Sequence, residues 1–334
     1  MSAVRGPACI PRSGSPVRVA FAAVRVCLMI EGQEDVTWEQ WLALAQACEE
    51  RSLEALFRSD HYSSVMGERF EDRGSLDAWA TVTGLAAHTE RLRLGTLVSP
   101  ATFRHPSELA KVVTTASHIS GGRIELGLGA GWNEREHRSY GFEFFDRSTR
   151  LARFAEQLEI VHRSWTEDEF DFDGEHYRLE RCRALPKPDG KPNLIVGGSA
   201  KRGTVEPAVR FADEYNTVFA SVEQCRERRR RLDEACERVG RDPASLTYSL
   251  MTGCCVGADR DDLLDRARRV MDVRGDEGDP AAWLERQSEA WVTGTPDEAR
   301  ERLGQLEQAG VERVMLQNLT HDDLRHVELI ASLA

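Results

Sequence analysis

The sequence lacks an uninterrupted apolar run of the roughly 18 residues that would suggest a membrane span. The nearest candidate, residues 17–30, is broken by Arg18 and Arg25. We therefore expect no membrane partner.

Within the N-terminal stretch of residues 1–22, residues 1–16 also lack the apolar run that a signal peptide needs. They hold several prolines among glycine and serine, a composition that does not build a packed core. This stretch predicts a disordered N-terminal extension, followed by one folded domain over residues 23–334.

The eight cysteines form no Cys-x-x-Cys pair and no Cys/His group at zinc spacing. Their scatter through apolar contexts fits reduced, mostly buried thiols. Cys254 and Cys255 are neighbours in an expected strand and would point to opposite faces, which favours packing over redox chemistry. We expect no metal site, and the reducing cytoplasm is the expected compartment.

A concentrated basic patch is also missing. Lys plus Arg number 44 against 56 Asp plus Glu, a formal charge of -12, which repels a phosphate backbone. The one basic run, Arg228–Arg231, lies on an expected helix, where adjacent side chains spread around the axis. The sequence predicts a solvated surface there and no nucleic-acid partner.

What the sequence does have is an alternation of short β-rich runs with longer helical patterns. In the helical segments apolar residues recur at three- and four-residue spacing, as at Trp38, Trp41 and Leu42. The expected strands cover residues 24–30, 55–58, 92–98, 123–128, 193–196, 215–219, 246–256 and 313–317. Repeated β/α units in this number predict an α/β fold, a closed (β/α)8 TIM barrel.

Two stretches interrupt the alternation and are expected to be insertions at the carboxyl-end loops. Residues 170–192 hold Asp173-Gly174 between short alternating runs, which predicts a small hairpin and an extended connector. Residues 275–291 add a helix after the seventh strand. Insertions of this kind commonly shape the access of a substrate.

Residues that follow the strands of such a barrel converge on one mouth. The second strand runs into Asp60 and His61, where the carboxylate is able to fix the tautomer of the imidazole and His61 is able to donate or accept a proton. A turn in which Asp60 caps the next segment is the alternative. Glu31 follows the first strand and is a second candidate for acid or base work, unless it is solvent exposed.

The fourth strand runs into a loop whose glycines let the backbone approach a flat ligand closely and whose Trp132 would wall the site. The residues concerned are Gly129, Ala130, Gly131, Trp132 and Asn133. An ordinary strand-to-helix turn is the alternative, and the spacing differs from the G-x-G-x-x-G fingerprint of dinucleotide sites.

The fifth strand runs into Gly197, Gly198 and Ser199, with Lys201 and Arg202 just before an expected helix. Backbone amides, a hydroxyl and two cations together favour an anion, most naturally a phosphate. An ordinary turn with a basic surface is the alternative.

Several of these segments resemble one known family, the luciferase-like flavin and deazaflavin oxidoreductases, and in particular its coenzyme F-420-dependent branch. The resemblance covers nearly the whole chain after Val24. It is carried by Met29-Ile30-Glu31-Gly32-Gln33, Arg58-Ser59-Asp60-His61, Leu94-Gly95-Thr96-Leu97-Val98, Ile119-Ser120-Gly121-Gly122-Arg123 and residues 127–134.

The resemblance implies a cofactor across the barrel mouth, with Asp60 and His61 near its redox ring. The loops after the fourth and fifth strands would contact its ring, ribityl chain or phosphate. The family also suggests a non-proline cis peptide at Leu97-Val98, next to Thr96, as a bulge that backs the ring. A homodimer is implied as well.

The expected reaction is hydride transfer between the deazaflavin C5 and a small organic substrate, with His61, or else Glu31, handling the proton. One alternative is a monooxygenase that uses reduced flavin mononucleotide (FMN) and oxygen. An alternative from another class is a non-catalytic flavin-binding or scaffold protein. The fold leaves the substrate unspecified.

Overall fold

The computed structural model describes residues 24–334. The extension expected over residues 1–22 therefore lies outside the described residues, and the domain boundary at residue 23 stays a prediction.

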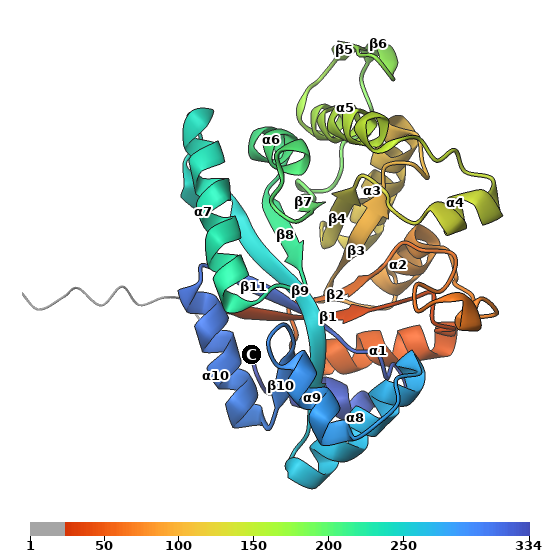
Figure 1. The fold of residues 1–334 in the computed structure, drawn as a ribbon. Coiled ribbons are helices and arrows are strands. Elements are labelled where there is room, and N and C mark those ends of the chain that lie inside the picture. Colours follow the sequence, from red (N-terminus) through yellow and green to blue (C-terminus); the bar gives the residue numbers. More distant parts are fainter. Residues whose placement is uncertain (1–23) are drawn as a thin grey trace, which may run out of the picture.

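Eight parallel strands close into a barrel, in the order β1-β2-β3-β4-β7-β8-β9-β11, with β11 paired back to β1 (Figure 1). Their bounds are β1 (Arg25–Ile30), β2 (Ala55–Arg58), β3 (Arg93–Pro100), β4 (Ile124–Gly129), β7 (Asn193–Gly197), β8 (Glu214–Val218), β9 (Thr247–Val256) and β11 (Arg313–Gln317). Each corresponds to one strand expected from the sequence. The predicted (β/α)8 TIM barrel is confirmed.

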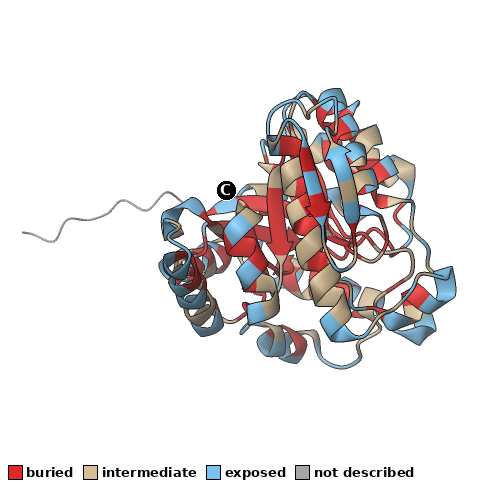
Figure 2. Cartoon of the chain, turned by 90° about the horizontal axis from the view of Figure 1, so that it is seen from above, coloured by how far each residue is buried: buried red, intermediate tan, exposed pale blue. Residues whose placement is uncertain are grey.

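Helices cover the outside of the barrel, and Figure 2 shows the buried strands within a more exposed helical layer. A capping box formed by Thr37 and Gln40 starts the first helix, whose Trp41 and Leu44 are buried against the strands. The covering helices are α1 (Trp38–Glu50), α2 (Ala78–Ala86), α3 (Pro106–Ser120), α5 (Arg147–Thr166), α6 (Arg202–Phe211), α7 (Val222–Arg238), α10 (Pro296–Gln308) and α11 (Leu324–Ala331).

A buried ion-pair group fills the amino end of the barrel. Arg313, at the start of β11, donates from Nη1 and Nη2 to both carboxylate oxygens of Glu125 at 2.7 and 2.9 Å, and Nη1 also reaches Glu214 at 3.0 Å. Burial by itself raises the pKa of Glu125, but the charge and hydrogen bonds of Arg313 outweigh it and lower this pKa to about 2. Side chains therefore occupy the amino end of the barrel.

The structure confirms the first hairpin but not its expected place. β5 (Phe170–Asp173) and β6 (Arg178–Cys182) form an antiparallel pair. They follow α5 rather than a strand, and the backbone amides at the hairpin tip donate to Glu156 of that helix. The expectation that this insertion lies over the barrel mouth is therefore wrong: the hairpin packs on the outside of α5 (Figure 1).

The second insertion does lie at the carboxyl end. After β9 come α8 (Arg260–Arg274), α9 (Pro280–Gln287) and the short β10 (Val292–Gly294), which pairs with the last residues of β9 beyond the barrel. Two further carboxyl-end loops are longer than a minimal turn. One joins β2 to α2 and contains η1 (Glu68–Phe70), and the other joins β4 to α5 and contains α4 (Glu134–Tyr140).

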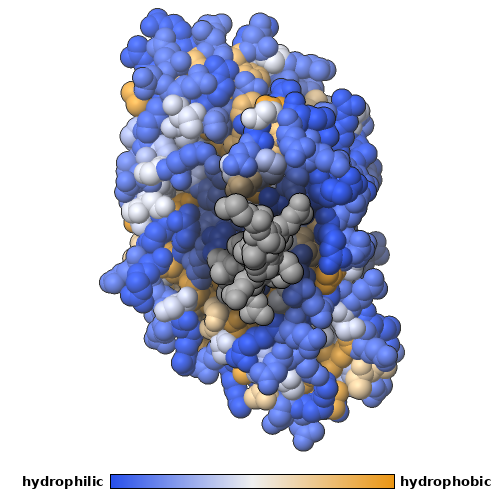
Figure 3. Space-filling view, turned by 90° about the vertical axis from the view of Figure 1, so that its left-hand side faces the viewer, coloured by the Kyte–Doolittle hydropathy of each residue, from blue (hydrophilic) through white to orange (hydrophobic). Residues whose placement is uncertain are grey.

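The surface carries its charge in pairs. On α7, Arg229 and Arg230 pair with acids three or four residues away on the same helix. The basic run expected to be solvated surface is thus spread around this helix, and Figure 3 shows the face with α7 and α10 as mainly hydrophilic.

Within residues 24–334, each helix is too short or too polar to cross a bilayer. The cysteines of this part of the chain are free thiols.

We predict that Arg313→Met lowers the free energy of unfolding by about 3–5 kcal/mol, because it removes the buried cation that Glu125 and Glu214 share and leaves only Arg93 beside Glu125. Urea unfolding at neutral pH measures the change. The matched control is Arg268→Met, which removes an exposed partner of Asp265 and should cost about 0.5 kcal/mol or less. Equal effects of the two substitutions would contradict this role of Arg313.

Candidate functional site

A cavity of about 560 Å³ opens at the carboxyl ends of the barrel strands. Of the residues predicted for the site, those that border it are Glu31, His61, Leu97, Val98, Gly129, Ala130, Gly131, Trp132, Asn133, Gly197 and Gly198. Asp60 and Thr96 are buried without bordering it, and Ser199 is exposed on the loop before α6. The structure thus brings the three predicted strand-end segments to one end of the barrel.

His61 is held by a carboxylate that the sequence did not suggest. Its Nδ1 lies 2.8 Å from Oε2 of Glu136, on α4, and the side chain of Glu136 is fully buried. The backbone amides of Tyr62 and Ser63 donate to the other oxygen of Glu136. With Nδ1 occupied, His61 has Nε2 for a ligand in the cavity that it borders.

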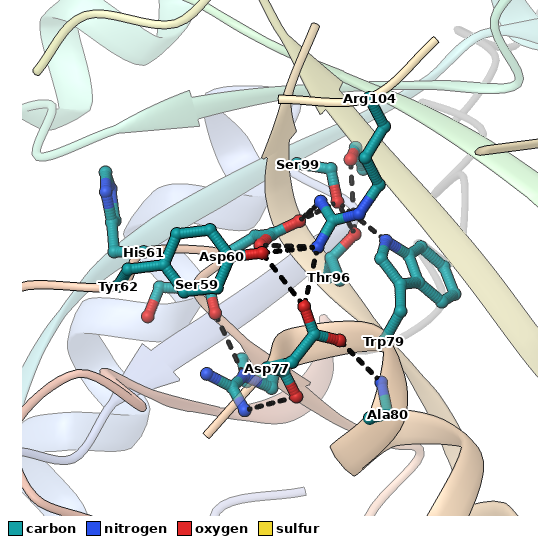
Figure 4. A network of polar contacts seen from close by, with 12 residues as sticks. Ser59, Asp60, His61, Tyr62, Asp77, Trp79, Ala80, Thr96, Ser99 and Arg104 are labelled. Carbon is teal, nitrogen blue, oxygen red and sulfur yellow. Dashed lines mark hydrogen bonds and ion pairs between the residues drawn. The ribbon is translucent and has the colours of Figure 1, made fainter. Parts of the chain in front are cut away.

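Asp60 does not contact His61, so the expected pairing of these two neighbours is wrong. Its carboxylate accepts hydrogen bonds from Ser99 Oγ and Arg104 Nη1, both at 2.6 Å, and Arg104 also reaches Asp77 at 3.0 Å. Figure 4 shows the side chains of Asp60 and His61 pointing in different directions. Successive residues of an extended chain point to opposite sides, so adjacency in sequence separates them.

The carboxylates around His61 set its charge. Burial by itself lowers the pKa of His61, but the hydrogen bond and charge of Glu136, with the charges of Glu31 and Asp60, outweigh it and hold the pKa above its usual range. The surroundings of His61 therefore favour its protonated form more than water does. An imidazolium beside a cavity is able to donate a proton to a bound molecule.

Val98 explains several of the glycines in the site. The peptide bond Leu97-Val98 is cis, as the family resemblance implied. The Val98 side chain lies against Gly127, Gly129 and Gly197, where an added Cβ would come within 2.8, 2.7 and 3.0 Å of its methyl groups. These glycines thus make room for Val98 in the wall of the cavity, which is a more specific reason than close approach of the backbone to a ligand.

The rest of the loop after β4 shapes the mouth. Gly131 has φ +77°, and a Cβ there would lie 2.6 Å from Thr102 Oγ1. Asn133 caps α4 through its side chain. Trp132 is 64% exposed, and its ring meets the His61 ring edge-on at a centroid distance of 5.6 Å. Trp132 is therefore placed to cover a ligand beside His61, as expected of a wall residue.

The loop after β7 keeps features that suit an anion. Gly198 lies where a Cβ would come within 2.4 Å of the Tyr215 hydroxyl, so this glycine too has a packing reason. Lys201 and Arg202 are exposed at the start of α6, and Arg202 pairs with Glu206 one turn later. An exposed ammonium beside an open helix N-terminus fits the phosphate expected there.

Glu31 is less free than expected of a proton-transfer group. It is 8% exposed and borders the cavity. One of its carboxylate oxygens accepts from Gln33 Nε2 at 2.8 Å, and the other accepts from Gln317 Nε2. Both oxygens are thus engaged by neutral amides of the protein, which leaves neither of them free for a ligand.

Comparison with known proteins gives the chain relatives over most of its length. A profile of the family described as luciferase-like monooxygenase matches residues 20–313. The pyrimidine monooxygenase RutA of Stutzerimonas stutzeri (strain A1501) is 30% identical over 230 residues, which are 65% of this chain and 59% of that protein. RutA of Pseudomonas syringae pv. syringae (strain B728a) gives the same values. The chain spans about three fifths of the length of these curated relatives.

Solved structures share the fold at low identity. An F-420-dependent secondary alcohol dehydrogenase in complex with an F-420-acetone adduct has a TM-score of 0.79 at 18% identity, covering 94% of this chain and 98% of that one. The 3,6-diketocamphane monooxygenase component from the CAM plasmid of Pseudomonas putida, in complex with FMN, has a TM-score of 0.71 at 17% identity, covering 93% and 97%. Both likenesses support the barrel fold.

We predict that Gly129→Ala lowers the free energy of unfolding by about 1–3 kcal/mol, because the added methyl group overpacks against Val98. Combining it with Val98→Ala removes the clash. The double variant should then be more stable than the sum of the single effects by about 1 kcal/mol. Urea unfolding of the four proteins measures this. Strict additivity would contradict the packing of Val98 against Gly129.

As a control, Gly304→Ala places a methyl group where no atom lies within 4 Å, inside α10. Alanine is the better helix former there, so this variant should match or exceed the wild type in stability.

We predict a pH-dependent effect for Glu136→Gln. Because the folded-state pKa of His61 is raised, its contribution to stability is present below the unfolded-state pKa and is lost as the pH rises through the folded-state value. The difference in unfolding free energy between wild type and Glu136→Gln should therefore be larger at about pH 6 than at about pH 9. Urea unfolding at both pH values tests it, and a difference that grows with pH would contradict the assignment.

Proposed function

Because the chain belongs to the luciferase-like monooxygenase family, we propose that it is a flavin-dependent monooxygenase that uses reduced FMN and molecular oxygen on a small organic substrate. The observation that carries the proposal is the cavity at the carboxyl end, bordered by a His61 ring that Glu136 holds in place. The pyrimidine monooxygenases among its relatives and the FMN complex among its structural neighbours favour FMN.

The residues of the cavity fit a flavin. Leu97, Val98 and Met251 give it apolar walls, as a tricyclic ring requires, and Trp132 stands at its mouth. The exposed Lys201 at the start of α6 suits the phosphate of FMN. When bound, the reduced flavin supplies the electrons for the reaction with oxygen.

The protein contributes a positioned proton and a dry site. Glu136 keeps the His61 ring oriented through Nδ1, so a proton at Nε2 is presented to the bound molecules. In its protonated form, which Glu136 favours, His61 would stabilise negative charge that develops on oxygen during the reaction. With a ligand bound, Trp132 would cover it beside His61 and so limit the access of water to that proton.

Hydride transfer from reduced coenzyme F-420 is the second candidate. It is favoured by the strand-end segments that resemble the F-420-dependent branch, together with the fold shared with the F-420-dependent alcohol dehydrogenase. In that reaction His61 would protonate the oxygen of a carbonyl substrate while the hydride adds to its carbon. The reaction needs no oxygen, which separates the two candidates.

The proposal includes the compartment and the oligomeric state of the protein. The free, mostly buried thiols suit the reducing cytoplasm, and the family resemblance suggests a homodimer. A scaffold role without catalysis is disfavoured because Glu136 and His61 form a complete proton-donating pair beside the cavity.

Titration with FMN and with coenzyme F-420, followed by flavin fluorescence, tests the choice of cofactor. We expect saturable binding of FMN and consumption of oxygen when FMN is reduced in the presence of substrate candidates. Saturable binding of F-420 alone, with oxygen-independent turnover, would establish the second candidate instead. Binding without any turnover over a broad substrate panel would favour the scaffold.

We predict that His61→Ala lowers kcat by about a hundredfold to ten-thousandfold, because it removes the positioned proton donor. The control is His88→Ala, which removes an exposed histidine on the outside of the barrel and should leave kcat unchanged. Steady-state kinetics with reduced flavin measures both. A kcat for His61→Ala within about threefold of the wild type would remove the proposed role of His61.

A further inference from the structure

One residue that borders the cavity has a buried polar atom without a partner among residues 24–334. Asn216 lies on β8, is 1% exposed and borders the cavity. Its amide nitrogen donates to Ser249 Oγ at 2.9 Å and faces the sulfur of Met315 at 3.5 Å. Its amide oxygen Oδ1 is buried and, among residues 24–334, lacks a hydrogen-bond partner.

The neighbours fix which way the Asn216 amide points. A thioether sulfur accepts hydrogen bonds and has no proton to donate, so the nitrogen of the amide belongs on the Met315 side. The oxygen is then the atom left over. Because a buried acceptor without a donor is costly, an atom of this kind in the wall of a binding cavity marks a contact that a ligand completes.

The other amide of this region presents the same polarity. Gln317 borders the cavity with its nitrogen turned to Glu31 Oε1, so its oxygen is the atom it has left. Both oxygens of Glu31 already accept hydrogen bonds. Besides the donor His61, the cavity is therefore bordered by two residues, Asn216 and Gln317, whose amide oxygens are left as acceptors, and these two suit a ligand that brings N–H donors.

We propose that Asn216 recognises the N–H group of a cyclic imide, the CO–NH–CO edge of a planar ring. The inference rests on the proposed function, because it concerns the same cavity. Two molecules carry this edge: the pyrimidine part of a flavin or deazaflavin ring, and a substrate with a uracil-like ring. An alkyl group in place of the N–H leaves Asn216 Oδ1 unpaired in either case.

The first arm of the test compares the binding of FMN with that of N3-methyl-FMN. If F-420 is the cofactor that binds, F-420 is compared in the same way with its derivative methylated at the imide nitrogen. The methyl analogue should bind the wild-type protein about tenfold to a hundredfold more weakly, as expected for an unpaired buried acceptor. Dissociation constants come from the fluorescence titration, so the readout does not depend on turnover.

Asn216→Leu should abolish this discrimination. Leucine has a similar volume, so a purely steric rejection of the methyl group would persist, whereas recognition of the N–H disappears. The matched control is Gln157→Leu, which also removes a buried amide with an unpartnered oxygen but lies on α5 and does not border the cavity. Gln157→Leu should discriminate as the wild type does. The comparison of the two ligands on the wild type holds even if one variant does not fold.

The second arm separates the two sources of the imide. Uracil and its 1,3-dimethyl derivative are titrated into the protein loaded with the tricycle. Discrimination between the two tricycles assigns the imide to the cofactor, and discrimination only between uracil and its derivative assigns it to the substrate. Each of these results supports recognition of an imide N–H by Asn216, provided that Asn216→Leu loses it.

The inference is overturned if methylation weakens neither ligand by more than about twofold, or if Asn216→Leu discriminates as strongly as the wild type. Failure of both FMN and F-420 to bind the wild-type protein is a different result. It refutes the proposed function, and the inference that rests on it falls as well.

Discussion

The buried carboxylate of Glu136 is the constraint on which the site depends. It has no access to water, so every hydrogen bond that it needs must come from the protein, and it takes them from His61 and from the backbone amides of Tyr62 and Ser63. Glu136 lies after β4 and His61 after β2. The contact between Glu136 and His61 therefore joins two carboxyl-end loops, orients the imidazole beside the cavity and favours its protonated form.

A second polar group keeps the loop after β2 in place from the other side. Asp60 is anchored by Ser99 and Arg104, behind the wall of the cavity, while His61 faces the cavity itself. The two neighbouring residues thus have different roles: Asp60 fixes the backbone of the loop, and His61 faces the ligand cavity (Figure 4). Val98 adds the apolar wall, which the glycines of β4 and β7 make possible.

The sequence predicts the barrel well because each of its units leaves a local signal. β-branched runs, capping residues such as Thr37, and amphipathic spacing each act within a few residues. The hairpin at Asp173-Gly174 is equally local. Its position is not, because it depends on Glu156 accepting from the backbone of the hairpin tip, a contact that hydropathy does not encode. The cis bond before Val98 followed from family resemblance, and periodicity alone does not indicate it.

The sequence predicts where the site lies, but it does not predict which side chains contact each other there. Strand ends of a barrel converge, so the three segments with Asp60-His61, Gly129 and Gly197 were expected at one mouth. The sequence did not predict Glu136 as the partner of His61, because Glu136 lies in a short polar segment whose composition is typical of a solvent-exposed helix. Only the folded structure shows that Glu136 is buried. Asn216 was not predicted as a site residue for a similar reason. It is a single polar residue within a strand that carries no motif, and only the folded structure shows that its amide oxygen has no partner.

The most direct test of this account is the ionisation of His61 itself, followed by NMR of the imidazole as the pH is raised. The account predicts that His61 titrates above the ordinary histidine value of about 6.5, and that its pKa falls when Glu136 is replaced by glutamine. A His61 that titrates at or below the ordinary value in the wild-type protein, or whose titration is unaffected by the loss of the Glu136 charge, would contradict it.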